Sequence, residues 1–184
     1  MKVLDCAEQG LQPTTNTEDE LVRFDVDYLM SYLGSIRGTS YSVVGQPDLQ
    51  ERESPQPDYL IEDRKNGNLI AIEHARLFES QESEKRFVFW AQALIAAEQI
   101  PMRWIRFPNP QQLGKRLSEF FDEKLSKGQL DKFGQCERIL LARNMWSGAV
   151  IRLLLSAEPY FKPQKRTACD HFYLIVEGRL LEMF

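Results

Sequence analysis

The chain has little cysteine and histidine, the residues that dominate disulfide frameworks and zinc sites. Its 184 residues include three cysteines, at positions 6, 136 and 169, and two histidines, His74 and His171. An odd number of widely spaced cysteines with no CxxC pair argues against a disulfide framework and favours a reducing compartment. A zinc site would have to combine these scattered residues, so none is expected.

The sequence also lacks a long apolar run. No stretch approaches the roughly 18–20 apolar residues that cross a bilayer. The first ten residues carry Asp5 and Glu8 where a signal peptide has its apolar core. We therefore expect a cytoplasmic protein that does not enter the membrane. The P-loop, GxGxxG, GxSxG and HExxH patterns are absent too, which argues against the common nucleotide-binding and hydrolase classes.

Composition and charge are those of an ordinary folded domain. Apolar residues make up 43% of the chain and charged residues 27%, so we expect a single domain over residues 1–184. The net charge of −4 argues against a generally basic nucleic-acid-binding protein. The charge is unevenly divided, with −8 over residues 1–80 and +4 over residues 81–184. Such a division can place carboxylates and phosphate-binding cations on one surface, although many soluble proteins carry uneven surface charge.

Hydrophobic periodicity predicts a mixture of helices and short strands. Helices are expected over residues 18–33, 81–99 and 111–127. Strands are expected over residues 41–44, 59–62, 69–74, 102–107, 138–141 and 172–176. Residues 149–155 fit either a strand or a buried helix. This order predicts an α/β fold, with a central mixed β-sheet flanked by α-helices.

The first helix has clear start and stop signals. Residues 1–16 are expected to form a loosely ordered leader, after which Thr17 and Glu20 match a capping box. Gly34 is the expected stop. The apolar stripe is expected to consist of Leu21, Phe24, Tyr28 and Tyr32.

A hairpin in the first half of the chain brings two carboxylates into one region. Asn66-Gly67 between two predicted strands supplies the positive φ angles of a tight turn. Asp58 begins the first strand and Glu73 lies near the end of the second, so both lie at the same edge of the hairpin. Two neighbouring carboxylates repel each other unless a cation lies between them. Mg²⁺ and Mn²⁺ prefer such hard oxygen ligands.

These residues resemble the PD-(D/E)XK nuclease superfamily, also called restriction-endonuclease-like. The resemblance rests on Pro57-Asp58-Tyr59-Leu60-Ile61 followed by Leu69-Ile70-Ala71-Ile72-Glu73. A helix–three-strand–helix–strand order over residues 18–107 supports it, and residues 108–184 are compatible with variable additions. The resemblance implies a restriction-endonuclease-like sheet, with Asp58 and Glu73 as the acids that hold Mg²⁺ or Mn²⁺.

One position departs from the family pattern. Ala75 stands where the family has its catalytic lysine, and alanine cannot activate water or stabilise a charged transition state. Some members supply the basic group from a nearby helix, so the resemblance suggests Lys85 or Arg86, near the start of the predicted second helix, with Lys85 as the favoured displaced catalytic residue. Glu20 on the first helix is a candidate for a further carboxylate that binds the metal ion or one of its ligands, although helix capping explains it equally well. His74 is expected to point away from Asp58, because side chains alternate along a strand.

The expected partner is nucleic acid, with DNA favoured over RNA, and a homodimer is a further possibility. The candidate phosphate-binding residues are Arg103, Arg106, Lys162, Lys165 and Arg166. A sequence cluster of Cys169, Asp170 and His171 offers a thiol beside an imidazole, but nothing else supports a nucleophile there.

Two functions from different classes follow from these residues. The first is metal-dependent hydrolysis of phosphodiester bonds in DNA or RNA; as an enzyme, the protein would be a Mg²⁺-dependent endonuclease. The alternative is a catalytically inactive protein of the same fold that binds nucleic acid or a protein partner, which the missing lysine favours. A third interpretation is a partner-binding subunit unrelated to nucleases, which predicts that Asp58 and Glu73 lie far apart.

Overall fold

The computed structural model describes residues 2–4, 18–47, 56–78, 80, 83, 108–146 and 149–184. The strands are β1 (Lys2–Leu4), β2 (Tyr41–Gly45), β3 (Tyr59–Asp63), β4 (Leu69–Leu77), β5 (Glu137–Asn144), β6 (His171–Val176) and β7 (Arg179–Glu182). The α-helices are α1 (Glu18–Arg37), α4 (Pro110–Leu125) and α5 (Ile151–Ala157). Short 3₁₀ turns cover Asp131–Phe133, Glu158–Tyr160 and Arg166–Ala168. The predicted mixed α/β class is confirmed.

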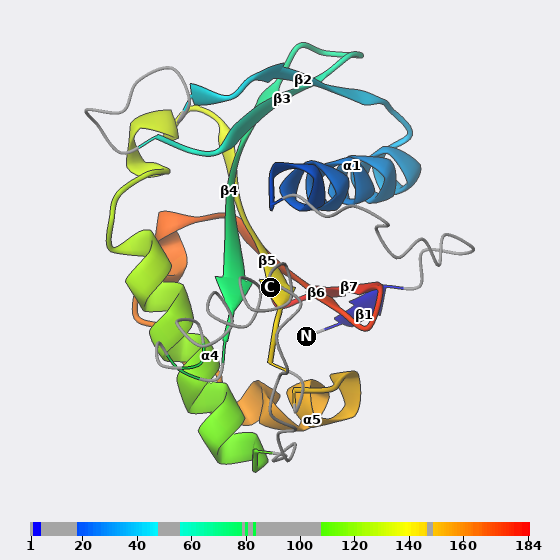
Figure 1. Cartoon of the computed structure of the whole chain (residues 1–184). Helices are drawn as coiled ribbons and strands as arrows, with labels where there is room; N and C mark the ends of the chain where they lie inside the picture. The colour runs from blue at the N-terminus through cyan, green and yellow to red at the C-terminus, as the bar shows by residue number, and fades with distance from the viewer. Residues whose placement is uncertain are drawn as a thin grey trace, which may run out of the picture.

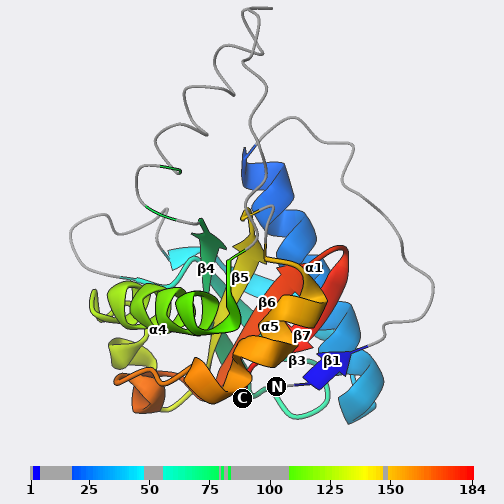
Figure 2. The same ribbon diagram turned by 90° about the horizontal axis from the view of Figure 1, so that it is seen from below.

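The described strands form one seven-stranded mixed sheet in the order β1-β7-β6-β5-β4-β3-β2. The three central strands β4, β5 and β6 are parallel, and all other neighbours are antiparallel. Helix α4 lies between β4 and β5 in the chain, and α5 lies between β5 and β6. Figures 1 and 2 show α1 and α4 on opposite sides of the sheet.

Each face of the sheet has its own hydrophobic core. On one face, Leu113, Leu117 and Phe121 of α4 and Leu154 of α5 pack on alternate strand residues such as Ala71. On the other face, α1 packs on the strand residues that alternate with those of the first core. The α1 residues are Val26, Leu29 and Leu33, and the strand residues include Ile70, Ile72, Leu141 and Tyr173. Because neighbouring strand residues point to opposite faces, each polar residue of β4 belongs to one side only.

Helix α1 is tied to β5 by side chains near both of its ends. Near its C-terminus, Arg37 donates two hydrogen bonds to the carboxylate of Glu137, at 2.7 and 2.6 Å. These bonds raise the pKa of the Arg37 guanidinium above its usual range. Nearer its N-terminus, Asp25 binds Arg143. The helix axis is therefore fixed against the central strand by two ion pairs as well as by apolar packing.

The first helix differs from its prediction in its end and in its buried stripe. It continues to Arg37 and ends at Gly38, whose φ of 63° is the left-handed conformation typical of a helix C-terminus. The amide of Thr39 donates to the carbonyl of Gly34 at 3.3 Å. The buried stripe runs through Val26, Leu29 and Leu33. Thr17 lies outside the described residues, so the capping box stays a prediction.

The strands agree with the predicted positions, but several are longer. Strand β4 extends to Leu77 and β5 covers Glu137–Asn144. The ambiguous segment is helical, as α5. Two strands were not predicted: β1, and β7, which follows the turn at Glu177 and Gly178 with φ angles of 52° and 73°.

The predicted β3–β4 hairpin is confirmed, and its connection covers residues 64–68, one residue fewer than predicted. Its register pairs Tyr59 with Ile72 and Glu62 with Leu69. In the turn only Gly67 has a positive φ, of 73°, so only one residue of the predicted Asn66-Gly67 pair is left-handed. The side-chain oxygen of Asn66 accepts a hydrogen bond from the backbone amide of Asn68 at 2.8 Å.

Some predictions cannot be compared with the described part of the chain. The helix over residues 81–99 and the strand over residues 102–107 lie outside it, as does the leader apart from β1. None of the helices that the structure describes offers an apolar stretch of the length that a bilayer requires.

Helix α4 crosses the segment after α5 at Gly114, where only glycine fits. A Cβ at this position would lie 2.5 Å from the Cβ of Tyr160 and 2.8 Å from the carbonyl oxygen of Ala157. We expect Gly114→Ala to lower the free energy of unfolding by about 1–2 kcal/mol, because overpacking exceeds the gain in helix propensity. Gly134→Ala is the control, since its Cβ would come no closer than 3.8 Å to Asp131. Urea denaturation in which Gly114→Ala is as stable as the unsubstituted protein would contradict this packing.

Candidate carboxylate site

Asp58 and Glu73 meet at one edge of the β3–β4 hairpin. Tyr59 pairs with Ile72, and one further step along this register places Asp58 opposite Glu73. The backbone amide of His74 donates to Asp58 Oδ2 at 2.7 Å, which fixes the aspartate against the end of this ladder. Residues opposite each other in antiparallel strands share a face. The interpretation as an unrelated subunit predicted that these residues lie apart, and this prediction is wrong.

Glu73 is a buried carboxylate on the α4 face of the sheet. It is only 5% exposed and lies between Ala71 and Ala75, which both belong to the core beneath α4. The amide group of Gln129, in the segment after α4, donates from Nε2 to Glu73 Oε1 at 2.7 Å. This charge is therefore held in an apolar surrounding, where an ionised carboxylate requires hydrogen bonds or a cation.

The side-chain oxygen of Gln129, Oε1, is a buried acceptor without a hydrogen-bond donor among the described residues. An unsatisfied buried acceptor costs about 1–3 kcal/mol, so this position favours a water molecule or a cation beside the oxygen. The donor set at this edge is then Asp58, Glu73 and Gln129, all of which offer oxygen. Such oxygens fit Mg²⁺ or Mn²⁺, which keep several waters in proteins.

The site holds two carboxylates and no third acidic or histidine ligand among the described residues. Within that part of the chain, no group of three or more His, Cys, Asp or Glu side chains is arranged to hold a metal ion. Ala75 shares the face of Glu73 and is 5% exposed, so β4 carries no basic side chain beside Glu73 on this face. Lys85 lies outside the described residues and stays a prediction.

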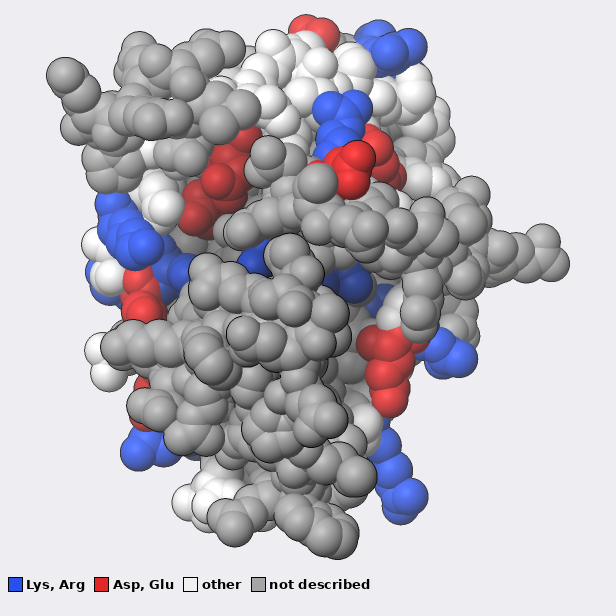
Figure 3. Space-filling model, viewed as in Figure 1, with Lys and Arg blue, Asp and Glu red and all other residues white. Residues whose placement is uncertain are grey.

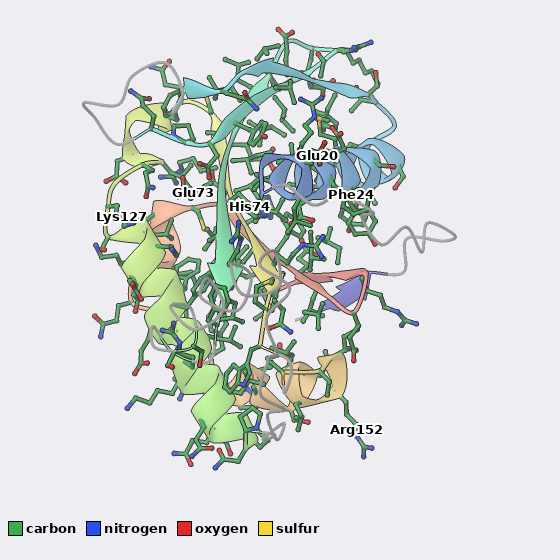
Figure 4. All side chains as sticks on the ribbon, viewed as in Figure 1. Glu20, Phe24, Glu73, His74, Lys127 and Arg152 are labelled. Carbon is green, nitrogen blue, oxygen red and sulfur yellow. The ribbon has the colours of Figure 1, made fainter. Side chains whose placement is uncertain are left out.

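The opposite face of the same strand carries a buried ionic cluster that the sequence did not reveal. His74 points away from Glu73, as predicted, and its Nε2 donates to Asp25 Oδ2 at 2.9 Å. Figure 4 shows the two labelled side chains on opposite sides of β4. Arg143 also binds Asp25, with Nε 2.8 Å from Oδ2 and with a second contact from Nη2 to Oδ1. The side chains of Asp25, His74 and Arg143 are 0%, 4% and 17% exposed.

The sequence contains a signal for this cluster, namely an acidic residue within the apolar face of the first helix. Asp25 lies on the stripe formed by Val22, Val26, Leu29 and Leu33, so it is an acid in the middle of an apolar helix face. The predicted stripe was displaced by one position, and Asp25 then fell outside it. A helix that buries an acid needs a basic partner on the sheet, and β5 provides Arg143.

The structure does not gather the other predicted site residues at Glu73. Glu20 is exposed on α1, which covers the face opposite Glu73. The amide of Lys165 binds Asp122 of α4 at 2.8 Å, and the amide of Lys162 binds the Ser118 hydroxyl at 2.8 Å, so this segment crosses the middle of α4. Arg166 stacks 4.7 Å from the ring centroid of Phe184. Arg103 and Arg106 lie outside the described residues.

The cluster at Cys169, Asp170 and His171 does not form a Cys–His pair. Cys169 is 3% exposed within the core beneath α4, whereas the ring of His171 stacks on Tyr173 of the α1 face. Burial raises the pKa of the Cys169 thiol to about 12, so the thiolate is not populated at neutral pH. Asp170 instead binds Arg138, which lowers the pKa of its carboxyl group.

Loss of Asp25 should destabilise the protein strongly. In Asp25→Ala, Arg143 and His74 stay buried without their shared partner, and we expect the free energy of unfolding to fall by about 3–5 kcal/mol. Asp27→Ala removes an exposed pair with Arg23 from the same helix and should cost at most about 0.5 kcal/mol. Equal losses for the two variants in urea denaturation would contradict the importance of the buried cluster.

The two described thiols should differ in reactivity. Cys136 is partly exposed and Cys169 is buried with a raised pKa. Treatment of the native protein with iodoacetamide near pH 8, followed by peptide mass spectrometry, should therefore modify Cys136 and leave Cys169 unmodified. Both should react in urea. Modification of Cys169 in the native protein at the rate of Cys136 would show that the core beneath α4 opens.

Comparison with known proteins does not assign the chain to a family. No model of a protein family matches the chain, and neither does any curated protein or solved structure. A function for the protein therefore has to be argued from its own residues.

Proposed function

We propose that the protein is a metal-dependent nuclease-like protein that hydrolyses phosphodiester bonds in nucleic acid at the Asp58–Glu73 edge. The observation that carries this proposal is the bond from the His74 amide to Asp58, which holds a second carboxylate next to buried Glu73. Two carboxylates kept this close are stable together when a cation neutralises them. The Oε1 atom of Gln129, which accepts no hydrogen bond from the described residues, would supply a third ligand of the same chemical type.

The order of the elements supports the nuclease-like interpretation. Helix α1 precedes the antiparallel strands β2, β3 and β4, and α4 precedes β5, which lies parallel to β4. This is the helix–three-strand–helix–strand order that the resemblance implies, with α4 and β5 as its second half. The sequence interpretation had placed that second half at residues 81–107, which lie almost entirely outside the described part of the chain.

Each residue of the site would have a separate role in hydrolysis. A bound Mg²⁺ would supply an activated water and stabilise negative charge on the phosphoryl group. Asp58 and Glu73 would hold the ion and neutralise its charge. Gln129 keeps the Glu73 carboxylate in one orientation through its 2.7 Å hydrogen bond. The apolar surroundings of Glu73 strengthen electrostatic interactions at this edge, because they exclude water.

A second function, binding without cleavage, is favoured by Ala75. No lysine is present on β4 beside Glu73, so a group that orients the attacking water has to come from elsewhere, as predicted for Lys85. If it does not, the same edge would bind a cation and nucleic acid without hydrolysis. In either case the proposed partner is nucleic acid, DNA before RNA; a homodimer and a cytoplasmic location stay predictions.

Glu73→Ala tests the proposed site directly. Supercoiled plasmid and single-stranded DNA should be cleaved in Mg²⁺ or Mn²⁺ and not in EDTA. Glu73→Ala and Asp58→Ala should each lower the rate on the order of a hundredfold or more, because charge stabilisation at the reacting phosphate is lost. Cleavage is followed on gels at matched protein concentration.

Glu62→Ala is the matched control. Glu62 lies four residues from Asp58 on the same hairpin, at its turn end, so its loss changes the charge equally without touching the site. Metal-dependent cleavage that persists in Glu73→Ala would overturn the proposed function. If no cleavage occurs, and Mn²⁺ binding measured by calorimetry depends on Glu73, the second function would hold.

A further inference from the structure

The segment that follows α5 is held along one side of α4 by its backbone (Figures 1 and 2). The amide of Lys162 donates to the Ser118 hydroxyl at 2.8 Å. The amide of Lys165 donates to Asp122 at 2.8 Å, and the backbone of Tyr160 lies close against the same helix. The contacted positions of α4 are four residues apart, so they form one stripe of the helix; they are Gly114, Ser118 and Asp122. Because the segment makes these contacts with its main chain, its exposed side chains remain available to bind a partner.

The exposed side of this segment is basic. Residues 158–166 contain three cations and one acid. The three cations are exposed, and none forms an ion pair with the residues that the structure describes; they are Lys162, Lys165 and Arg166. Asp122 of α4 accepts backbone amides of the segment with both carboxylate oxygens, and Glu119 pairs with Lys115 of its own helix. The three cations therefore keep their donors for an anionic partner.

An exposed aromatic ring accompanies these cations. Tyr160 is 47% exposed and belongs to neither hydrophobic core. Such a ring can stack with a nucleobase, since every base has a flat π-face. At the other end of the segment, the guanidinium of Arg166 lies 4.7 Å from the ring centroid of Phe184. The segment thus combines cations that suit phosphate groups with a ring that suits bases, as surfaces that bind single strands do.

The contacted stripe of α4 leads towards the carboxylate site. One further turn beyond Asp122 reaches Ser126, and exposed Lys127 follows it. Gln129, two residues later, donates to Glu73 at 2.7 Å. Figure 3 shows Lys and Arg atoms over this end of α4, at the left edge, beside Asp and Glu atoms nearer the centre. From its first contact with the segment to Ser126 the helix rises about 18 Å, about the length of five stacked nucleotides, so a short strand spans the whole stripe.

We propose that the surface formed by residues 160–166 and Lys127 binds single-stranded nucleic acid along α4. The cations hold backbone phosphates, and a base stacks on the ring of Tyr160. Bases inside a duplex stack on one another and offer no free face to this ring, so a single strand fits better than a duplex. The inference rests on the proposed function in its choice of nucleic acid, and it adds the class of strand and the surface that holds it. An acidic peptide would use the cations alone, so the tyrosine ring distinguishes the two partners.

Tyr160→Ala tests the stacking contact. Binding of a fluorescent oligodeoxythymidine of about 20 nucleotides is followed by anisotropy in EDTA, so that no metal-dependent cleavage occurs. We expect saturable binding to the unsubstituted protein and a Kd roughly tenfold weaker in Tyr160→Ala. Tyr160→Phe keeps the ring and should bind as tightly as the unsubstituted protein.

Tyr160→Ala should leave the segment in place, because the alanine keeps the Cβ atom that lies against Gly114. Folding is checked by circular dichroism. If Tyr160→Ala does not fold, Tyr160→Leu removes the ring but keeps an apolar side chain, and it should show the same loss of binding.

Lys165→Gln tests the phosphate contacts. The slope of log Kd against log salt concentration should become shallower by about 0.7 for one lost contact, whereas Tyr160→Ala should leave the slope unchanged. Arg152→Gln on α5 is the matched control, because it removes the same charge from a side chain that points away from α4 (Figure 4). It should bind the oligonucleotide with the Kd and the salt slope of the unsubstituted protein.

The proposal is overturned if the unsubstituted protein does not bind the oligonucleotide in EDTA, or if it binds the duplex with the complementary strand equally well. It is also overturned if Tyr160→Ala binds as tightly as the unsubstituted protein; weaker binding in Lys165→Gln alone would then indicate a surface for acidic proteins. Because this assay contains no metal, its result is independent of cleavage at the Asp58–Glu73 edge, and the two proposals can fail separately.

Discussion

The arrangement of the molecule depends on His74, whose backbone amide and side chain bind two different carboxylates. The amide, in the plane of the sheet, donates to Asp58 at 2.7 Å, and the ring, on the α1 face, binds Asp25 at 2.9 Å. Asp25 in turn binds Arg143 of the neighbouring strand. The position of the carboxylate edge is thus linked to the docking of α1. Burying an ionic cluster carries a large desolvation cost. Here the cluster attaches α1 and also fixes β4, the strand that carries Glu73.

The predictions that succeeded rest on local physics. Alternation along residues 69–74 assigned Glu73 and His74 to opposite faces, and the Gly67 turn set the register that brings Asp58 to Glu73. Contacts over long sequence distances were not predictable in this way. Gln129 lies 56 residues from Glu73, and Arg143 lies 118 residues from Asp25. Gln129 and Arg143 both reach their partners through the connection from β4 to β5 that contains α4, for which a single sequence gives no register.

Ala75 and Gln129 both decide whether the Asp58–Glu73 edge can bind a metal ion and catalyse hydrolysis. Ala75 stands where the resemblance implies a lysine, whereas Gln129 offers an oxygen ligand that the resemblance does not imply. A site of two carboxylates and an amide can hold a divalent cation through oxygen ligands alone. Whether catalysis follows depends on a basic group supplied from outside β4.

The most direct test of the central claim is the anomalous difference density of a crystal soaked in Mn²⁺. The account predicts a peak beside Asp58 and Glu73, in contact with at least one oxygen of each carboxylate and near Gln129 Oε1. In a crystal of Glu73→Ala treated identically, the peak should be absent. Density for Asp58 and Glu73 with no ion between them at millimolar Mn²⁺, or an ion bound only elsewhere on the surface, would contradict the claim.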